Sequence, residues 1–171
     1  MGRQAQMADA RRMLAGTRLL TLAGPGGGGK TRLALELAPK LASGFADGVW
    51  LVELAAVSRP DLVTQRVAAA LGVRESAQRP LAGLAEQLAE RRMLLLLDNC
   101  EHLVETTARL AESLLQGCPD LYIVATSRES LNVPGEVVMR VPALSLPDLE
   151  GPLNAASVGE SEAVALFVER A

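Results

Sequence analysis

The stretch GPGGGGKT at residues 24–31 places five glycines before a lysine and a threonine. Gly24 and Gly29 hold the glycine positions of the pattern GxxxxGK(S/T), and Lys30 and Thr31 complete it. Backbone without Cβ atoms can curl so that successive N–H groups point into one concave anion site. We therefore interpret this stretch as a phosphate-binding loop that joins a strand to a helix.

The residues of this loop have different expected roles toward a nucleotide. Backbone amides from about Gly27 to Thr31 are expected to bind the β-phosphate, and the Lys30 ammonium to contact β- and γ-oxygens. The Thr31 hydroxyl is a typical Mg²⁺ ligand in such loops. The residues expected to contact the nucleotide here are Gly24, Pro25, Gly26, Gly27, Gly28, Gly29, Lys30, Thr31 and Arg32.

Short apolar runs alternate with longer amphipathic stretches along the chain. The runs lie at residues 19–23, 49–54, 93–98, 121–126 and 137–142. Most of them are apolar on both faces, which is typical of a parallel sheet covered by helices on both sides. The pattern predicts an α/β fold with a mainly parallel five-stranded sheet.

Helix signals fill the intervals between these runs. One helix is expected over about 29–41, and another follows Ser58 and ends at Gly72. Ser58 and Asp61 have the spacing of a capping box. Two more helices are expected, one beginning at Pro80 and one ending at Gly117.

Composition narrows the function classes. The 171-residue chain is 49% hydrophobic and carries a formal net charge of −3, so direct nucleic-acid contact is not expected. Cys100 and Cys118 lack a CxxC spacing, which argues against a disulfide scaffold or a zinc site. No apolar run approaches the roughly 20 residues of a membrane helix, and the stretch MGRQAQMADARRML at residues 1–14 has no apolar h-region of a signal peptide. A cytoplasmic protein without membrane contact is expected.

Asp98 is a second candidate site residue, because it ends the apolar run 93–98. A carboxylate at the carboxyl end of a buried strand beside the loop can bind Mg²⁺, directly or through water, opposite Thr31. By itself, an Asp in this position also fits a turn or a helix cap. Together with the loop, it predicts a Mg²⁺ site formed by Thr31 and Asp98.

Two other functions fit parts of the pattern. Gly24, Gly26 and Gly29 also spell GxGxxG, and Glu53 lies where a dinucleotide fold places its ribose-binding acid. An NAD-dependent oxidoreductase would not need the lysine and threonine of the loop. A P-loop kinase for a small molecule would need an acceptor pocket and an arginine-bearing lid, for which residues 74–79 are short. Both functions stay as alternatives.

Three segments together resemble the nucleotide-binding domain of NB-ARC-type signal-transduction ATPases. They are GPGGGGKTRLALELA, MLLLLDNCEHL and YIVATSRESLNVPGEVVMRVPALSLP, in this order along nearly the whole chain. The nearest resemblance is to bacterial members in multidomain transcriptional regulators of the LuxR and SARP kinds. It implies a P-loop NTPase three-layer sandwich with strand order 5-1-4-3-2. It also implies a switch domain that binds ATP or ADP with Mg²⁺ and hydrolyses ATP weakly.

The resemblance implies further site residues. A GR near the start of such domains contacts adenine, which implies this role for Gly2 and Arg3. A TSR at the end of the fourth strand senses the γ-phosphate, which implies this role for Thr126, Ser127 and Arg128. The residues thereby expected to take part in hydrolysis are Lys30, Asp98 and Arg128.

The expected domain organisation has three parts. A lead-in helix with the GR pair occupies residues 1–16, and the nucleotide-binding domain occupies residues 17–150. Residues 151–171 are expected to begin a helical region that continues in a longer protein. The resemblance implies that the partners are an adenine nucleotide, other domains of the same regulator and, on ATP binding, a second copy of the chain.

One departure from the family pattern concerns turnover. Asn99 follows Asp98 where many such proteins have a second acid, and an amide cannot accept a proton from water, so slow hydrolysis is expected. Glu101 is a substitute acid, or it complements the dipole of the following helix. His102 lacks partners for a catalytic triad and is interpreted as a helix-surface residue.

Overall fold

The computed structural model describes residues 4–74, 76 and 78–143. Gly2, Arg3 and the helical region expected over 151–171 therefore lie outside the described residues. Within them, the strands form one sheet in the order β2-β3-β4-β1-β5, and all neighbouring pairs are parallel. The strands are β1 (Leu19–Ala23), β2 (Val49–Glu53), β3 (Met93–Asp98), β4 (Leu121–Ser127) and β5 (Glu136–Arg140). This order confirms the expected P-loop NTPase fold.

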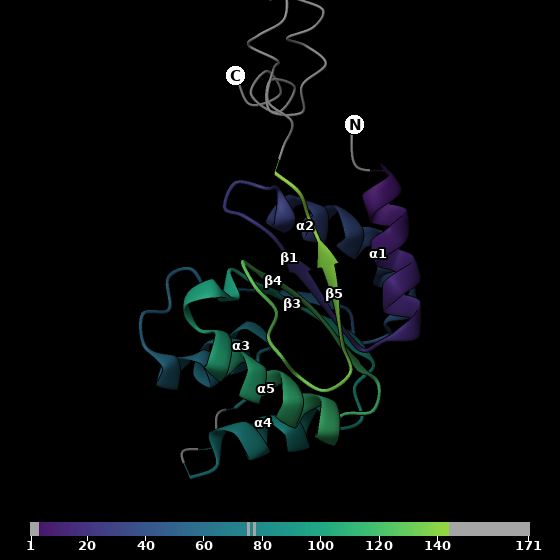
Figure 1. Ribbon diagram of the computed structural model, residues 1–171. Helices are drawn as coiled ribbons and strands as arrows, with labels where there is room; N and C mark the ends of the chain where they lie inside the picture. Colours follow the sequence, from purple (N-terminus) through teal and green to yellow (C-terminus); the bar gives the residue numbers. More distant parts are fainter. Residues whose placement is uncertain (1–3, 75, 77, 144–171) are drawn as a thin grey trace, which may run out of the picture.

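Helices cover both faces of the sheet (Figure 1). One face is covered by α1 (Gln4–Gly16) and α2 (Lys30–Leu41), and the other by α3 (Val63–Ala70), α4 (Pro80–Leu88) and α5 (Val104–Gly117). Three short 3₁₀ turns in the described part are η1 (Ala42–Gly44), η2 (Pro60–Leu62) and η3 (Cys100–His102). No helix within the described residues is long and apolar enough to cross a bilayer.

The central strand β3 shows why the apolar runs lack alternation. Successive side chains of a strand point to opposite faces of the sheet. Leu95 and Leu97 belong to the hydrophobic cluster under α3, α4 and α5, whereas Leu94 and Leu96 belong to the cluster under α1 and α2. All four side chains are buried, so both faces of this strand need apolar residues.

The ends of α3 confirm one boundary prediction and contradict another. Gly72 follows the helix with φ +64°, and the N–H groups of Gly72 and Val73 donate to the carbonyls of Ala69 and Ala68, which closes the helix as a Schellman motif. The capping box expected at the start was wrong. Arg59 precedes the η2 turn there, and its Nε donates to the Asp61 carboxylate at 3.1 Å instead.

We predict that Gly72→Ala lowers the free energy of unfolding by about 1–2 kcal/mol, because a Cβ is strained in the left-handed conformation. Gly44→Ala is the matched control, since Gly44 has no left-handed φ and open space around its Cβ position. The control is expected to be neutral or slightly stabilising. Urea denaturation measures both, and equal effects of the two substitutions would contradict the proposed C-cap.

Candidate functional site

The glycine-rich loop joins β1 to α2 at the carboxyl edge of the sheet. Gly27 and Gly29 have φ values of +73° and +71°, which glycine adopts without the strain that a Cβ brings. A Cβ on Gly24 would lie 2.2 Å from the carbonyl oxygen of Val141, so this position also requires glycine. At Gly26 and Gly27 a Cβ would meet nothing within 4 Å. The loop thus keeps bare backbone facing open space, as a phosphate cradle requires.

Lys30 begins α2 and is buried, with 8% of its surface exposed. Its Nζ donates to the carbonyl oxygens of Gly24 and Pro25, both at 2.9 Å. The Gly28 N–H also donates to the Pro25 oxygen, at 3.2 Å, so the loop curls around the ammonium. Among the residues that the structure describes, no carboxylate pairs with Lys30. A buried cation without a counter-charge favours binding of an anion in the loop.

The Asp98 carboxylate connects the loop helix to the sheet. Its Oδ1 accepts hydrogen bonds from the Thr31 hydroxyl at 2.7 Å and from the Thr126 hydroxyl at 2.6 Å. The Thr126 hydroxyl in turn accepts from the Asn99 N–H at 2.9 Å. Thr31 and Asp98 therefore lie together, as the sequence predicts. A hydroxyl beside a carboxylate is an oxygen donor set that fits Mg²⁺.

Pairing of β4 with β1 places the TSR residues beside the loop. Ser127 lies opposite Ala23, and its carbonyl accepts the Gly24 N–H at 3.2 Å. The hydroxyl of Ser127 accepts from the Glu129 N–H at 3.4 Å, and that of Thr126 is bonded to Asp98 and Asn99. These two hydroxyls therefore serve the protein's own structure. Their contact with a nucleotide stays a prediction.

The side chains of Arg128 and Arg32 form ion pairs in this structure. Arg128 is 68% exposed, and its Nη2 lies 3.0 Å from the Oε1 of Glu101, which is 20% exposed. The Nε of Arg32 donates to Glu36 at 2.8 Å, one turn further along α2. The expected contacts of both arginines with a nucleotide stay predictions. Sequence spacing gave no signal for the Arg128 pair, because it joins different elements.

Asn99 has a structural role that sequence reasoning missed. It follows β3 with φ +63° and ψ +52°, in the left-handed region that Asn tolerates better than most residues. This conformation turns the chain sharply from β3 into the η3 turn. An Asn directly after the Asp that ends a strand is the sequence signal for such a left-handed turn.

Cys100 follows this turn and is fully buried. Burial raises the pKa of its thiol to about 12, and the negative charge of Asp98 contributes in the same direction. The Sγ donates to the carbonyl of Leu97 at 3.3 Å. The thiol therefore stays protonated at neutral pH and is a packing residue, not a nucleophile.

The sheet order argues against a dinucleotide site. In the dinucleotide-binding fold, the strand with the ribose-binding acid is the direct neighbour of the strand before the glycine loop. Here β2, which ends at Glu53, is separated from β1 by β3 and β4. Three strand spacings of about 4.8 Å place Glu53 too far from the loop for this role.

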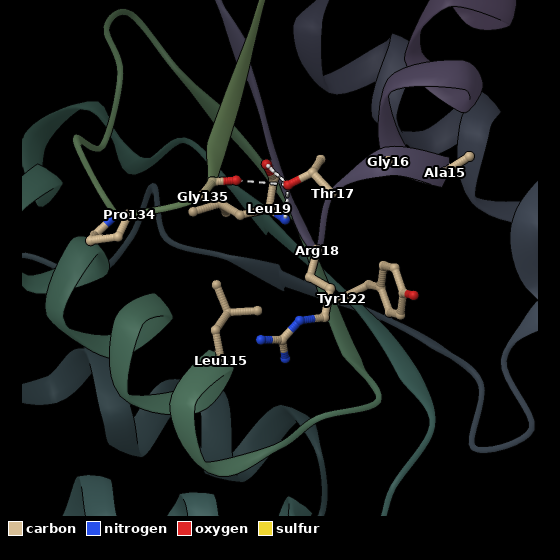
Figure 2. A pocket seen from close by; sticks show the side chains of 9 residues that line it. All are labelled: Ala15, Gly16, Thr17, Arg18, Leu19, Leu115, Tyr122, Pro134 and Gly135. Carbon is tan, nitrogen blue, oxygen red and sulfur yellow. Dashed lines mark hydrogen bonds between the residues drawn. The ribbon is translucent and has the colours of Figure 1, made fainter.

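A hollow of about 410 Å³ lies at the opposite edge of the sheet, at the amino end of β1 (Figure 2). The polar side chains of Thr17 and Arg18, which line it, are bonded to the protein. The Thr17 hydroxyl donates to the Gly135 carbonyl at 2.7 Å, and Arg18 donates to the Cys118 carbonyl at 2.9 Å. A second hollow of similar volume lies between α5 and the segment around Leu131. Neither contains a residue of the glycine loop.

Comparison with known families agrees with this geometry. A family model described as an AAA domain matches residues 12–133, which is most of the chain and includes the loop, Asp98 and Arg128. The chain belongs to the AAA domain family. Its sheet order and the left-handed glycines of its loop agree with this family.

Relatives of this AAA domain occur in Mycobacterium tuberculosis. An uncharacterized protein is 39% identical over 172 residues, which cover 100% of this chain and 40% of the relative. Another, whose name proposes an HTH-type transcriptional regulator, is 42% identical over 162 residues, covering 94% of this chain and 17% of the relative. The chain thus spans less than half the length of the curated relatives it matches.

Solved structures share the fold of the AAA domain at low sequence identity. Cdc6p from Pyrobaculum aerophilum has a TM-score of 0.60 and 20% identity, covering 82% of this chain and 45% of that one. A signal transduction ATPase with numerous domains from Pyrococcus horikoshii, which carries a tetratricopeptide repeat sensor, has a TM-score of 0.58 and 16% identity. It covers 99% of this chain and 25% of that chain. These likenesses show the fold alone.

We predict that Thr126→Val destabilises the AAA domain by about 1–3 kcal/mol, because Asp98 and Asn99 each lose a partly buried hydrogen bond to the Thr126 hydroxyl. Thr21→Val is the matched control. Thr21 is equally buried on β1, and its hydroxyl has no hydrogen-bond partner among the described residues. Its replacement is expected to be neutral or stabilising in thermal unfolding. Equal losses of stability in both variants would contradict the stabilising role of the hydrogen bonds that join Thr126 to Asp98 and Asn99.

Proposed function

We propose that this AAA domain binds ATP and ADP with Mg²⁺ and acts as a nucleotide switch with weak ATPase activity. The observation that carries the proposal is the buried Lys30 ammonium inside a loop of bare backbone at the start of α2. The only partners of Lys30 among the described residues are loop carbonyls, which are weaker partners for an ammonium than phosphate oxygens. A polyphosphate supplies the anion that this arrangement favours.

Each site residue has a role in this proposal. The loop amides and Lys30 bind the β- and γ-phosphates, while Thr31 and Asp98 hold Mg²⁺. When bound, the metal neutralises charge on the phosphate oxygens. Arg128 binds the γ-phosphate from the end of the neighbouring strand β4. Thr126 keeps Asp98 in place by the hydrogen bond that it donates.

The wider context is also a proposal. The resemblance to NB-ARC-type domains in LuxR and SARP regulators supports adenine contact by Gly2 and Arg3, signal transduction, and assembly of copies on ATP binding. A relative whose name proposes an HTH-type transcriptional regulator is more than five times as long as the matched region, since the match covers 17% of it. This supports further domains of a transcriptional regulator as partners.

Slow turnover follows from the residue after Asp98. Asn99 places an amide there, and its backbone N–H is bonded to Thr126. An amide orients water but does not accept a proton from it. A slow ATPase suits a switch, because the bound nucleotide then persists long enough to report a state.

A small-molecule kinase would need an acceptor pocket beside the loop, and the two hollows described above lie elsewhere.

We predict that Lys30→Ala weakens binding of Mg·ADP by about ten- to a hundredfold, because charge-assisted hydrogen bonds to phosphate are lost. Lys40→Ala is the control, since Lys40 is the chain's other lysine and is exposed in the last turn of the same helix. Isothermal titration calorimetry measures both variants. Wild-type protein that gives no binding heat, or equal affinities of the two variants, would contradict the proposal.

We predict that Asn99→Asp raises the rate of ATP hydrolysis about tenfold or more, because a carboxylate can accept the proton of the attacking water. Aspartate also tolerates the left-handed conformation of this position. Asn99→Gly controls for the backbone and is expected to leave the rate at or below the wild-type value. Phosphate release under saturating Mg·ATP is the measurement. An unchanged rate in Asn99→Asp would show that this position does not limit turnover.

A further inference from the structure

The ion pair between Arg128 and Glu101 lies beside the phosphate-binding loop and has no part in the fold core. Arg128 follows β4, whose last residue Ser127 is bonded to Gly24 of the loop. Glu101 lies in the η3 turn, three residues after Asp98. The two charges therefore meet at the edge of the sheet where β3 and β4 end, next to the proposed site for the γ-phosphate.

We propose that Glu101 is the resident counter-ion of Arg128, which the γ-phosphate displaces, so that Glu101 sets the preference between ATP and ADP. This inference rests on the proposed nucleotide-switch function. The Arg128 side chain is 68% exposed, and its Nη2 lies 3.0 Å from the Glu101 Oε1. Such a contact is readily exchanged, and a phosphate offers the same fork of oxygens with more negative charge. ADP lacks the γ-phosphate and leaves the pair intact.

Of the two residues in this pair, Glu101 is held in place more firmly than Arg128. Glu101 is 20% exposed and sits in a turn that is anchored on both sides. Cys100 before it is fully buried, and the His102 ring nitrogen Nε2 lies 2.9 Å from the carbonyl oxygen of Val57. The N–H of Leu103 closes the turn on the Cys100 carbonyl at 2.9 Å. The exchange of partners therefore requires movement of the exposed Arg128 side chain only.

Neighbouring acids provide a built-in comparison. Glu129 is exposed, directly follows Arg128, and forms no ion pair among the described residues. Substituting it with glutamine changes the net charge near the site as much as the same change at Glu101. A general electrostatic effect on a polyanionic ligand would therefore appear in both variants. An effect through the Arg128 pair would appear only at Glu101.

The test is calorimetric binding of Mg·ADP and a Mg-bound non-hydrolysable ATP analogue to wild type, Glu101→Gln, Glu129→Gln, Arg128→Gln and the double variant Glu101→Gln/Arg128→Gln. Exposed ion pairs contribute little, so we expect Glu101→Gln to raise the affinity ratio of triphosphate to diphosphate about two- to fivefold. We expect Glu129→Gln to leave this ratio unchanged. In the Arg128→Gln background, Glu101→Gln should have no further effect.

The outcomes separate this inference from the function on which it rests. Wild type that binds both nucleotides, with an unchanged ratio in Glu101→Gln, would overturn the counter-ion role alone. An equal rise of the ratio in the presence and absence of Arg128 would also overturn it, since simple repulsion would then explain the effect. Wild type that binds neither nucleotide would overturn both. Should Glu101→Gln fold poorly, Arg128→Gln must still weaken triphosphate binding selectively.

Discussion

Because the strands of the described sheet are all parallel, the chain returns across a face of the sheet after each strand, and the carboxyl ends meet at one edge. This constraint brings the glycine loop after β1, Asp98 at the end of β3 and Arg128 after β4 into one neighbourhood. It also buries both faces of the inner strands under helices. The apolar runs and the polar site are two consequences of the same arrangement.

A network of small polar groups then holds the site together. One oxygen of Asp98 accepts hydrogen bonds from Thr31 of α2 and Thr126 of β4, while Thr126 also accepts the N–H of Asn99. The network therefore joins the loop helix to two neighbouring strands. Lys30 is held by loop carbonyls in a similar way. These neutral loop carbonyls are weaker partners for a buried cation than phosphate oxygens are.

Much of the fold was predictable because it depends on local patterns. The boundaries of β1 and β3 agree with the predicted runs at 19–23 and 93–98, and the glycine loop lies between a strand and a helix as expected. Parallel burial leaves a strong signal in sequence, since no polar alternation interrupts these strands. The strand order came from the family resemblance and not from the runs themselves.

The rest of the site depends on contacts between segments far apart in sequence. The bond from Thr126 to Asp98 and the pair of Arg128 with Glu101 need the lateral register of β3 and β4, which spacing along one segment does not contain. The failed capping box at Ser58 has a local cause. Pro60 begins a 3₁₀ turn there, and Asp61 pairs with Arg59.

Amide NMR tests most directly whether the bare amides of the glycine loop bind a polyphosphate. Titration of ¹⁵N-labelled protein with Mg·ADP should shift the amide resonances of Gly26, Gly27, Gly28 and Gly29. The resonances of Gly44 and Gly72, outside the loop, should stay in place. Loop resonances that remain unmoved at saturating Mg·ADP would contradict the claim.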